Sequence, residues 1–265
     1  MDLHLKDKHV VVAGGSSGIG FACALEFLNE GATVSIISRS VELLSESYAL
    51  LISLVPTAQG KLFLSRCDLS DADAVKTAID AIEESTGAID VLVNSFGTPS
   101  RKDPFALSTD DWQDAMSSKY FSYMNIITPV VNKMKDRGQG SIVNIAGTGG
   151  KSPRPYGIPR GVASSAIMAA TVGLAAEFGK FGVRLNVVNP DIVLTGNQLK
   201  HLPLRERLES ITIENAVSMA SEKMPFGRVA LAKEIADAVV FLSSARASYI
   251  SGTILTVDGA ANPVI

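Results

Sequence analysis

The sequence is poor in the residues that build metal sites and disulfide frameworks. Its 265 residues include only two cysteines, Cys23 and Cys67, and three histidines. Two cysteines provide no disulfide framework, and no cysteine and histidine stand at metal-ligand spacing. We therefore expect no metal ion, and a reducing, cytoplasmic location.

An excess of positive charge is also lacking. The formal net charge is −3 and the isoelectric point is about 5.7. Basic residues are not clustered with interleaved aromatic residues, which is the pattern of nucleic-acid binding surfaces. We expect no nucleic-acid partner.

Long hydrophobic runs are absent as well. The longest uncharged run, 161–176, is shorter than the ~20 residues of a membrane-spanning helix and is rich in small residues. The amino terminus is polar and charged, unlike a signal peptide. We expect no membrane association, and a run that forms a buried or subunit-facing helix.

What the chain does have is a hydrophobic strand, Val10–Val12, that ends in glycines and continues as a helix. Hydrophobic and small residues recur at helical spacing after the glycines, and Gly31 provides a stop. Backbone N–H groups and the helix dipole would point at this turn, and glycines let a pyrophosphate approach the main chain. The stretch therefore predicts a dinucleotide site.

The glycine spacing alone leaves two other interpretations. An ordinary tight turn uses the same residues. The segment 14–18 also matches the Gly-x-Ser-x-Gly nucleophile elbow of α/β-hydrolases, with Ser16 as the nucleophile. An elbow serine follows several strands and precedes an acid and a histidine, whereas Ser16 follows the first strand and only His201 lies downstream. The hydrolase interpretation is therefore the weaker one.

Strands and helices alternate along the rest of the chain. Strand patterns at 33–37, 61–67 and 90–93 are separated by helical patterns at about 42–54 and 72–82. This alternation predicts one α/β domain over 1–265, a doubly wound parallel sheet with helices on both faces. Ligands would then bind beyond the carboxyl ends of the strands.

The second strand ends at Ser38 and Arg39. An acidic residue at this place binds the ribose 2′-hydroxyl of NAD, whereas an arginine accommodates the 2′-phosphate of NADP. Because Arg39 stands where the acid would be, we expect NADP(H) as the cofactor.

Beyond the glycine turn, several segments resemble the short-chain dehydrogenase/reductase family over nearly the whole length. They are Asp68, 94–97, the strands 140–145, 183–190 and 252–259, and Met224–Arg228. The resemblance implies a seven-stranded Rossmann-like sheet, a small-molecule substrate, and a dimer or tetramer that pairs through the helix 161–176. Small residues on that helix would permit close packing, namely Ala163, Ala166, Ala170 and Gly173.

The glycine turn, the strand ends and the resemblance together assign a set of cofactor-binding residues. They are Gly14, Ser16, Ser17, Gly18, Ile19, Gly20, Ser38, Arg39, Asp68, Leu69, Asn94, Gly97, Pro190, Ile192 and Thr195.

Catalysis in this family uses an Asn, a Ser, a Tyr and a Lys four residues after the Tyr. The resemblance places Lys119 at the Asn position and Gly147 at the Ser position, with Thr148 beside it. Without gaps, Arg160 falls at the Tyr position and Ser164 at the Lys position. All four positions are thus substituted.

Tyr156 is four residues before Arg160, which imitates a Tyr-x-x-x-Lys pair with an arginine in place of the lysine. Pro159 fits only the first turn of a helix, so Tyr156 is predicted to precede that helix. The candidate catalytic residues are therefore Lys119, Thr148, Tyr156, Arg160 and Ser164.

These residues predict an NADP(H)-dependent oxidoreductase that acts on a carbonyl or hydroxyl group through an atypical centre. The alternative is a redox-silent NADP(H)-binding protein with a regulatory or binding role. Lys119 and Arg160, with Lys151 and Arg154 nearby in sequence, add positive charge, so we expect an anionic substrate. The loop at about 195–224 should cover it.

Overall fold

The computed structural model describes residues 1–97, 102–195, 213–222 and 224–263. Its strands are β1 His9–Ala13, β2 Thr33–Ser38, β3 Leu62–Arg66, β4 Val91–Asn94, β5 Gly140–Ile145, β6 Val183–Pro190, β7 Val193–Leu194, β8 Ala230–Leu231 and β9 Ile254–Val257. Its helices are α1 Gly18–Asn29, α2 Val41–Leu54, α3 Ala72–Thr86, α4 Thr109–Ala115, α5 Ser122–Arg137, α6 Ile158–Phe178, α8 Ile213–Glu222 and α9 Ala232–Ser243. Shorter helical segments are introduced below where they matter.

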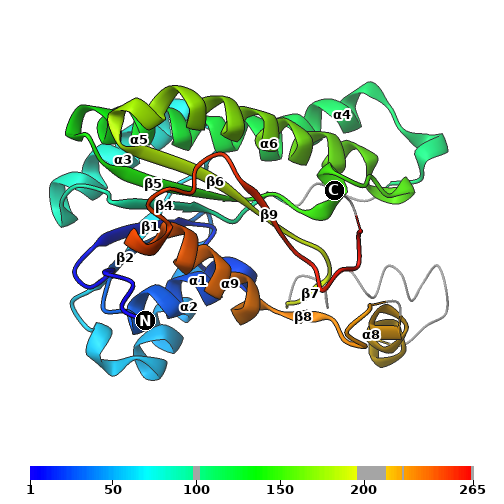
Figure 1. Ribbon diagram of the computed structural model, residues 1–265, viewed down its shortest axis with the longest axis horizontal. Coiled ribbons are helices and arrows are strands. Elements are labelled where there is room, and N and C mark those ends of the chain that lie inside the picture. Colours follow the sequence, from blue (N-terminus) through cyan, green and yellow to red (C-terminus); the bar gives the residue numbers. More distant parts are fainter. Residues whose placement is uncertain (98–101, 196–212, 223, 264–265) are drawn as a thin grey trace.

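Seven strands form one parallel sheet in the order β3-β2-β1-β4-β5-β6-β9. Helices α1, α2 and α9 cover one face, and α3, α5 and α6 cover the other (Figure 1). The predicted doubly wound, Rossmann-like sheet with helices on both faces is thus confirmed. A separate pair, β7 and β8, lies beyond this sheet.

Burial on both faces explains why the strands are continuously hydrophobic. In β1, Val10 and Val12 pack into the core shared with α1 and α9, whereas Val11 packs into the core shared with α3 and α5. Side chains alternate between the faces of a strand, so most positions of a central strand are apolar. The hydrophobic runs found in the sequence follow from this position.

The predicted element bounds agree closely with the structure at the sheet's centre. β5 and β6 have the predicted bounds, 140–145 and 183–190. The third helix, α3, is longer than predicted and ends at Thr86, where Gly87 with φ +96° stops it. The predicted covering loop holds helix α8 at 213–222, and residues 196–212 and 223 lie outside the described part of the chain.

Helix α6 is the longest apolar helix in the described part of the chain. With its flanking turns, Pro155–Phe181, it is long and apolar enough by length and composition to cross a membrane. Here it lies along the sheet, where Ile167, Met168 and Ala175 join the core on that face. The same length and composition occur in core helices of soluble proteins.

Candidate active site

The glycine turn lies where the order of the strands reverses. β1 pairs with β2 on one side and with β4 on the other, both in parallel register. From this centre the sheet extends through β2 and β3 on one side and through β4, β5, β6 and β9 on the other. Open α/β sheets bind ligands at such a switch point, beyond the carboxyl ends of the strands.

Two glycines of the turn have no room for a side chain. A Cβ on Gly14, whose φ is +79°, would lie 2.3 Å from the carbonyl oxygen of Ser95. A Cβ on Gly20 would lie 2.1 Å from the carbonyl oxygen of Gly14. These contacts hold β1, the start of α1 and the loop after β4 close together, which forms the cradle a pyrophosphate requires.

Between these glycines, Gly15 is buried, Ser17 is exposed, and the other residues are partly buried. Gly18 has a φ of +58°, and Ser17 is the exposed N-cap of α1 without a side-chain capping bond. Ile19 opens the first turn of the helix and is partly buried. The backbone N–H groups of the first turn of α1 and the Ser17 hydroxyl are therefore available as hydrogen-bond donors at the edge of the sheet.

The end of β2 brings a second group of predicted residues to the same edge. The Ser16 hydroxyl donates to the Ser38 hydroxyl at 3.0 Å. Arg39 is exposed. The pKa of the neighbouring Asp68 carboxyl is lowered, chiefly because it accepts hydrogen bonds from the backbone N–H and hydroxyl of Ser70 and also because Arg39 is near. Arg39 and Asp68 thus flank one corner of the cradle.

Asn94 and Leu69 hold the strand ends from inside. Asn94 is fully buried, and its amide nitrogen donates to the side-chain oxygen of Asn144 on β5 at 2.8 Å. Asn144 in turn donates to the Thr171 hydroxyl of α6 at 2.9 Å. Leu69 is buried in the core. The Asn94 amide nitrogen therefore joins β4 to β5, which is a structural role.

A π-helical segment, η3 Met116–Phe121, brings Lys119 into the site. Gly97, with φ +75°, makes room for this segment, because a Cβ there would lie 2.7 Å from the carbonyl oxygen of Ser118. One-turn π-segments inside helices occur frequently at functional sites. Sequence periodicity gave no indication of this segment.

The carbonyl oxygen of Ala146, directly after β5, is the point where two candidate residues meet. The Lys119 ammonium donates to it at 2.6 Å and the Ser164 hydroxyl at 3.2 Å. Lys119 is only 5% exposed. Burial, and then the charge of Arg160, lower the pKa of Lys119 to about 7. An amine with this pKa can give up a proton near neutral pH.

Thr148 belongs to the same loop and forms a second cluster. It begins the short helical segment η4 Thr148–Gly150, and its hydroxyl donates to the Asp191 carboxylate at 3.0 Å. Arg154 pairs with the same carboxylate at 2.6 Å. The expected contribution of Arg154 to the positive charge of the pocket is therefore offset by a carboxylate. Lys151 is exposed and donates to the Thr256 hydroxyl at 3.5 Å.

Tyr156 precedes helix α6, as Pro159 predicted. It lies in the 3-10 turn η5 Pro155–Gly157 and is 63% exposed, whereas Pro159 is in the first turn of α6. Arg160 is on α6, and a Cβ on Gly157 would lie 3.6 Å from one of its terminal nitrogens. The prediction that Tyr156 stands outside the helix is confirmed.

The end of β6 completes the edge. Pro190 is the last residue of β6, and Ile192 and Thr195 follow at the short strand β7. The methyl carbon of Thr195 would be 3.7 Å from a Cβ on Gly18, so this segment borders the glycine turn. Asp191, between Pro190 and Ile192, was not singled out in the sequence. Its position after β6 was the only signal available.

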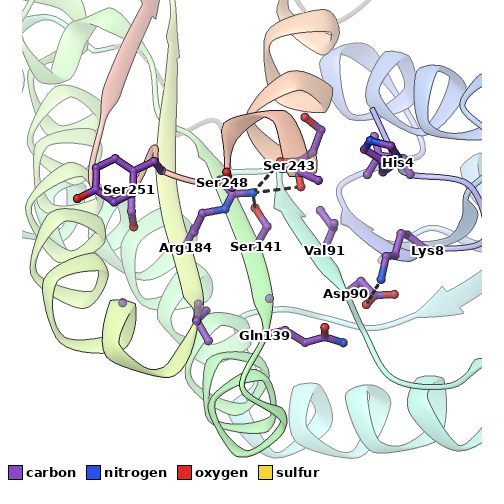
Figure 2. A pocket seen from close by; sticks show the side chains of 18 residues that line it. His4, Lys8, Asp90, Val91, Gln139, Ser141, Arg184, Ser243, Ser248 and Ser251 are labelled. Carbon is purple, nitrogen blue, oxygen red and sulfur yellow. Dashed lines mark hydrogen bonds and ion pairs between the residues drawn. The ribbon is translucent and has the colours of Figure 1, made fainter. Parts of the chain in front are cut away.

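A cavity of about 510 Å³ opens at the opposite, amino-terminal edge of the sheet (Figure 2). Its most buried charge is Arg184, which donates to the carbonyl oxygens of Leu242 and Ser244 at the end of α9, and whose pKa is lowered by burial. A cation at a helix carboxyl end offsets the helix dipole, so Arg184 has a structural role. Lys8 pairs with Asp90 nearby.

Comparison with known proteins identifies the family. The family described as enoyl-(acyl carrier protein) reductase matches residues 13–262. A 3alpha-hydroxysteroid dehydrogenase of Mediterraneibacter gnavus is 31% identical over 261 residues, which cover 98% of this chain and 99% of that protein. The chain belongs to the short-chain dehydrogenase/reductase family. Its relatives are dehydrogenases and reductases.

Solved structures of this family superpose closely. L-sorbose reductase from Gluconobacter frateurii, complexed with NADPH and L-sorbose, has a TM-score of 0.92 and 27% identity, with both chains covered in full. An NADPH-bound short-chain oxidoreductase from Pseudomonas aeruginosa PAO1, described as containing an atypical catalytic center, has a TM-score of 0.88 and 28% identity over 97% of this chain and 98% of that one.

Within the part of the chain that the structure describes, no group of three or more His, Cys, Asp or Glu side chains could hold a metal ion. Both cysteines are buried and unpaired.

Proposed function

We propose that this protein is an NADP(H)-dependent oxidoreductase that reduces a carbonyl or oxidises a hydroxyl group through an atypical centre. The observation that carries the proposal is the placement of Lys119. Its ammonium is buried at the carboxyl edge of the sheet, 2.6 Å from the Ala146 carbonyl oxygen and beside Arg160. Similarity to NADPH-bound short-chain reductases supports the choice of cofactor.

The residues present fit a dinucleotide. Gly14 and Gly20 admit no Cβ because protein backbone packs against them, whereas a Cβ on Gly18 would meet only Thr195, at 3.7 Å, so the backbone at Gly18 is open to a pyrophosphate. Arg39, with the hydroxyls of Ser16 and Ser38, would hold a 2′-phosphate through charge-assisted hydrogen bonds. Of the other predicted contacts, Asn94 and Leu69 are buried beneath this edge, and the rest, from Ser17 to Thr195, are proposed to border it. When bound, the nicotinamide supplies or accepts a hydride.

Lys119 takes the role of proton donor in this proposal. In the reducing direction its ammonium gives a proton to the substrate oxygen as negative charge develops there, and it recovers a proton from solvent. Arg160 stays charged at all relevant pH values, so it stabilises the oxyanion electrostatically and transfers no proton. The Ser164 hydroxyl donates to Ala146 and helps fix the loop on which this geometry depends.

The substrate proposed is a small molecule with a negative charge near its reacting carbon. Arg160 and the protonated form of Lys119 carry positive charge where the family has neutral side chains, and a substrate carboxylate would offset that charge. Because Arg154 pairs with Asp191, the argument rests on these two residues. The segment at about 195–224 is proposed to cover this substrate. The whole chain, 1–265, is proposed to form a single domain.

The competing proposal is a redox-silent NADP(H)-binding protein in which Lys119 and Arg160 occupy a site that has lost its catalytic activity. Both proposals need the cofactor cradle and differ in turnover. Two buried free cysteines fit a reducing compartment, so we place the protein in the cytoplasm.

NADPH oxidation, followed by absorbance, tests the proposal. Keto acids are compared with their neutral amides, using the wild type, Lys119→Met and the control Lys133→Met, whose lysine pairs with Asp80 and Glu83 outside the site. We expect turnover that prefers acids and that falls at least about 100-fold in Lys119→Met, within the range of general acid catalysis. Preference for neutral compounds would contradict the charge argument. Binding of NADPH without turnover of any compound would favour the silent alternative.

A further inference from the structure

Asp191 is the most highly connected carboxylate at the carboxyl edge of the sheet among the described residues. Its Oδ1 accepts from the Thr148 hydroxyl at 3.0 Å and from Arg154 at 2.8 Å. Its Oδ2 accepts from Arg154 at 2.6 Å and from the Asn262 amide nitrogen at 3.2 Å. The side chain is only 7% exposed. Three separate parts of the chain thus meet on one carboxylate.

The carboxyl-terminal segment reaches Asp191 through a tight turn after β9. The Asp258 carboxylate accepts from the backbone N–H groups of Ala260 at 3.0 Å and Asn262 at 2.9 Å. Gly259 and Ala260 both have positive φ values, +60° and +63°, which reverse the chain. The Asn262 amide nitrogen then lies between Asp258, at 3.1 Å, and Asp191.

The chemistry of Asp191 also fixes the direction of one hydrogen bond. A carboxylate paired with an arginine accepts and does not donate, so the hydroxyl hydrogen of Thr148 must point at Asp191. The Thr148 oxygen then has only lone pairs for any other partner. A ligand group that meets this oxygen has to be a hydrogen-bond donor, such as an alcohol.

We propose that Asp191 is a positioning residue that couples the carboxyl-terminal segment 258–262 to the site loop 147–154 and presents Thr148 solely as a hydrogen-bond acceptor. The coupling stands on the contacts above. The second part, that Thr148 accepts from a substrate hydroxyl, rests on the proposed oxidoreductase function. It names the substrate class more closely, as a compound with a hydroxyl group at or beside the reacting carbon.

Hydrogen exchange of the full-length protein without cofactor tests the coupling and needs no activity. The N–H groups of Gly150, Lys151 and Ser152 are bonded within the loop, to Gly147 and Thr148. We expect them to exchange about tenfold faster in both Asp191→Ala and Asn262→Ala, about the loss of one charge-assisted hydrogen bond. Asp80→Ala, which removes an exposed partner of Lys133 at 2.8 Å, is the control and should leave the loop unchanged.

The distant variant separates coupling from a local structural role. If Asn262→Ala leaves the loop amides at the wild-type rate, the coupling is refuted. Should Asp191→Ala lose protection throughout the sheet, Asn262→Ala, which leaves the bonds of Asp191 to Thr148 and Arg154 in place, carries the test with the same expected result. Loss of loop protection in Asp80→Ala would also count against the proposal.

A kinetic comparison tests the acceptor role once the NADPH screen has found a substrate with a hydroxyl group. In Asp191→Asn the new amide can donate to Thr148, so we expect KM to rise about tenfold with kcat changed less. Adding Asp191→Asn to Thr148→Val should raise KM no further. A further rise in the double variant would overturn the acceptor role, whereas absence of any turnover overturns the proposed function and leaves the exchange result standing.

Discussion

Lys119 is buried beside Arg160, and this arrangement is destabilising while both side chains are charged. A residue kept at such a cost in stability indicates a function. Burial and Arg160 lower its pKa from 10.5 to about 7. The fold therefore favours the neutral amine, and retaining the lysine reduces stability at lower pH. A proton-transfer role would account for that loss of stability.

The pH dependence of stability follows from this shift. Between pH 7 and 10.5 the unfolded chain holds the Lys119 proton and the folded chain does not, so this residue makes stability rise with pH through that window. Below pH 7 its destabilising effect is complete. We expect Lys119→Met to gain stability relative to the wild type as the pH falls from 10 to 6.

Denaturant unfolding of both proteins at pH 6, 8 and 10 measures this difference. Lys133→Met, which removes a partly buried lysine in ion pairs with Asp80 and Glu83, is the control and should lack the gain. A difference between Lys119→Met and the wild type that is independent of pH would contradict the lowered pKa.

At the scale of elements, the junction of β1 and α1 is the most constrained part of the site. Its glycines allow backbone atoms to approach so closely that no room is left for a methyl group. At Gly20, for example, a Cβ would lie 2.1 Å from the Gly14 carbonyl oxygen. Gly173 in α6 is not constrained in this way, because a Cβ there would meet nothing within 4 Å.

Gly20→Ala and Gly173→Ala are therefore a matched pair. Gly20→Ala should lose NADPH binding and lower the unfolding temperature, because the turn has to open. Gly173→Ala should keep NADPH binding, because a Cβ there meets nothing within 4 Å in the protomer. Calorimetric titration and thermal unfolding provide both values. Unchanged cofactor affinity in Gly20→Ala would show that the cradle lies elsewhere.

The sequence predicts those elements whose cause is local. Continuous apolar runs mark the central strands because both faces are buried, and Pro159 marks the start of α6 because it lacks an N–H. The π-helical segment that carries Lys119 packs against Gly97, which is distant in sequence, and the local periodicity does not reveal it. Asp191 acquires its partners from segments far apart in sequence, including Asn262.

The sequence of helix α6 does not reveal which of its sides faces outward. Ala163 was expected on its subunit-facing side, but it is fully buried within the protomer. Small residues occur all round this helix and so give no indication of which side faces outward. The structure places Val162 and Val172 outward, each 42% exposed.

For the whole molecule, this outward apolar side of α6 supports the proposed homo-oligomer. A charge in the middle of a symmetric interface faces its own copy, so one substitution introduces repulsion twice. We expect light scattering to show a dimer or tetramer for the wild type and a smaller species for Val172→Glu. Glu177→Lys, at an exposed position near the end of the helix, is the control. A wild-type monomer at micromolar concentration would rule out the proposal.

Every step of the proposed reaction depends on NADP(H) at the glycine turn, so the preference of the protein for NADPH over NADH is the decisive measurement. NADPH and NADH are titrated into the wild type, Arg39→Ala and the control Arg246→Ala, whose arginine binds the backbone of Asp2 elsewhere. We predict tighter NADPH binding in the wild type and in the control, and about a tenfold or greater loss of NADPH affinity alone in Arg39→Ala. Equal affinity for both cofactors in the wild type, or an unchanged NADPH affinity in Arg39→Ala, would contradict the account.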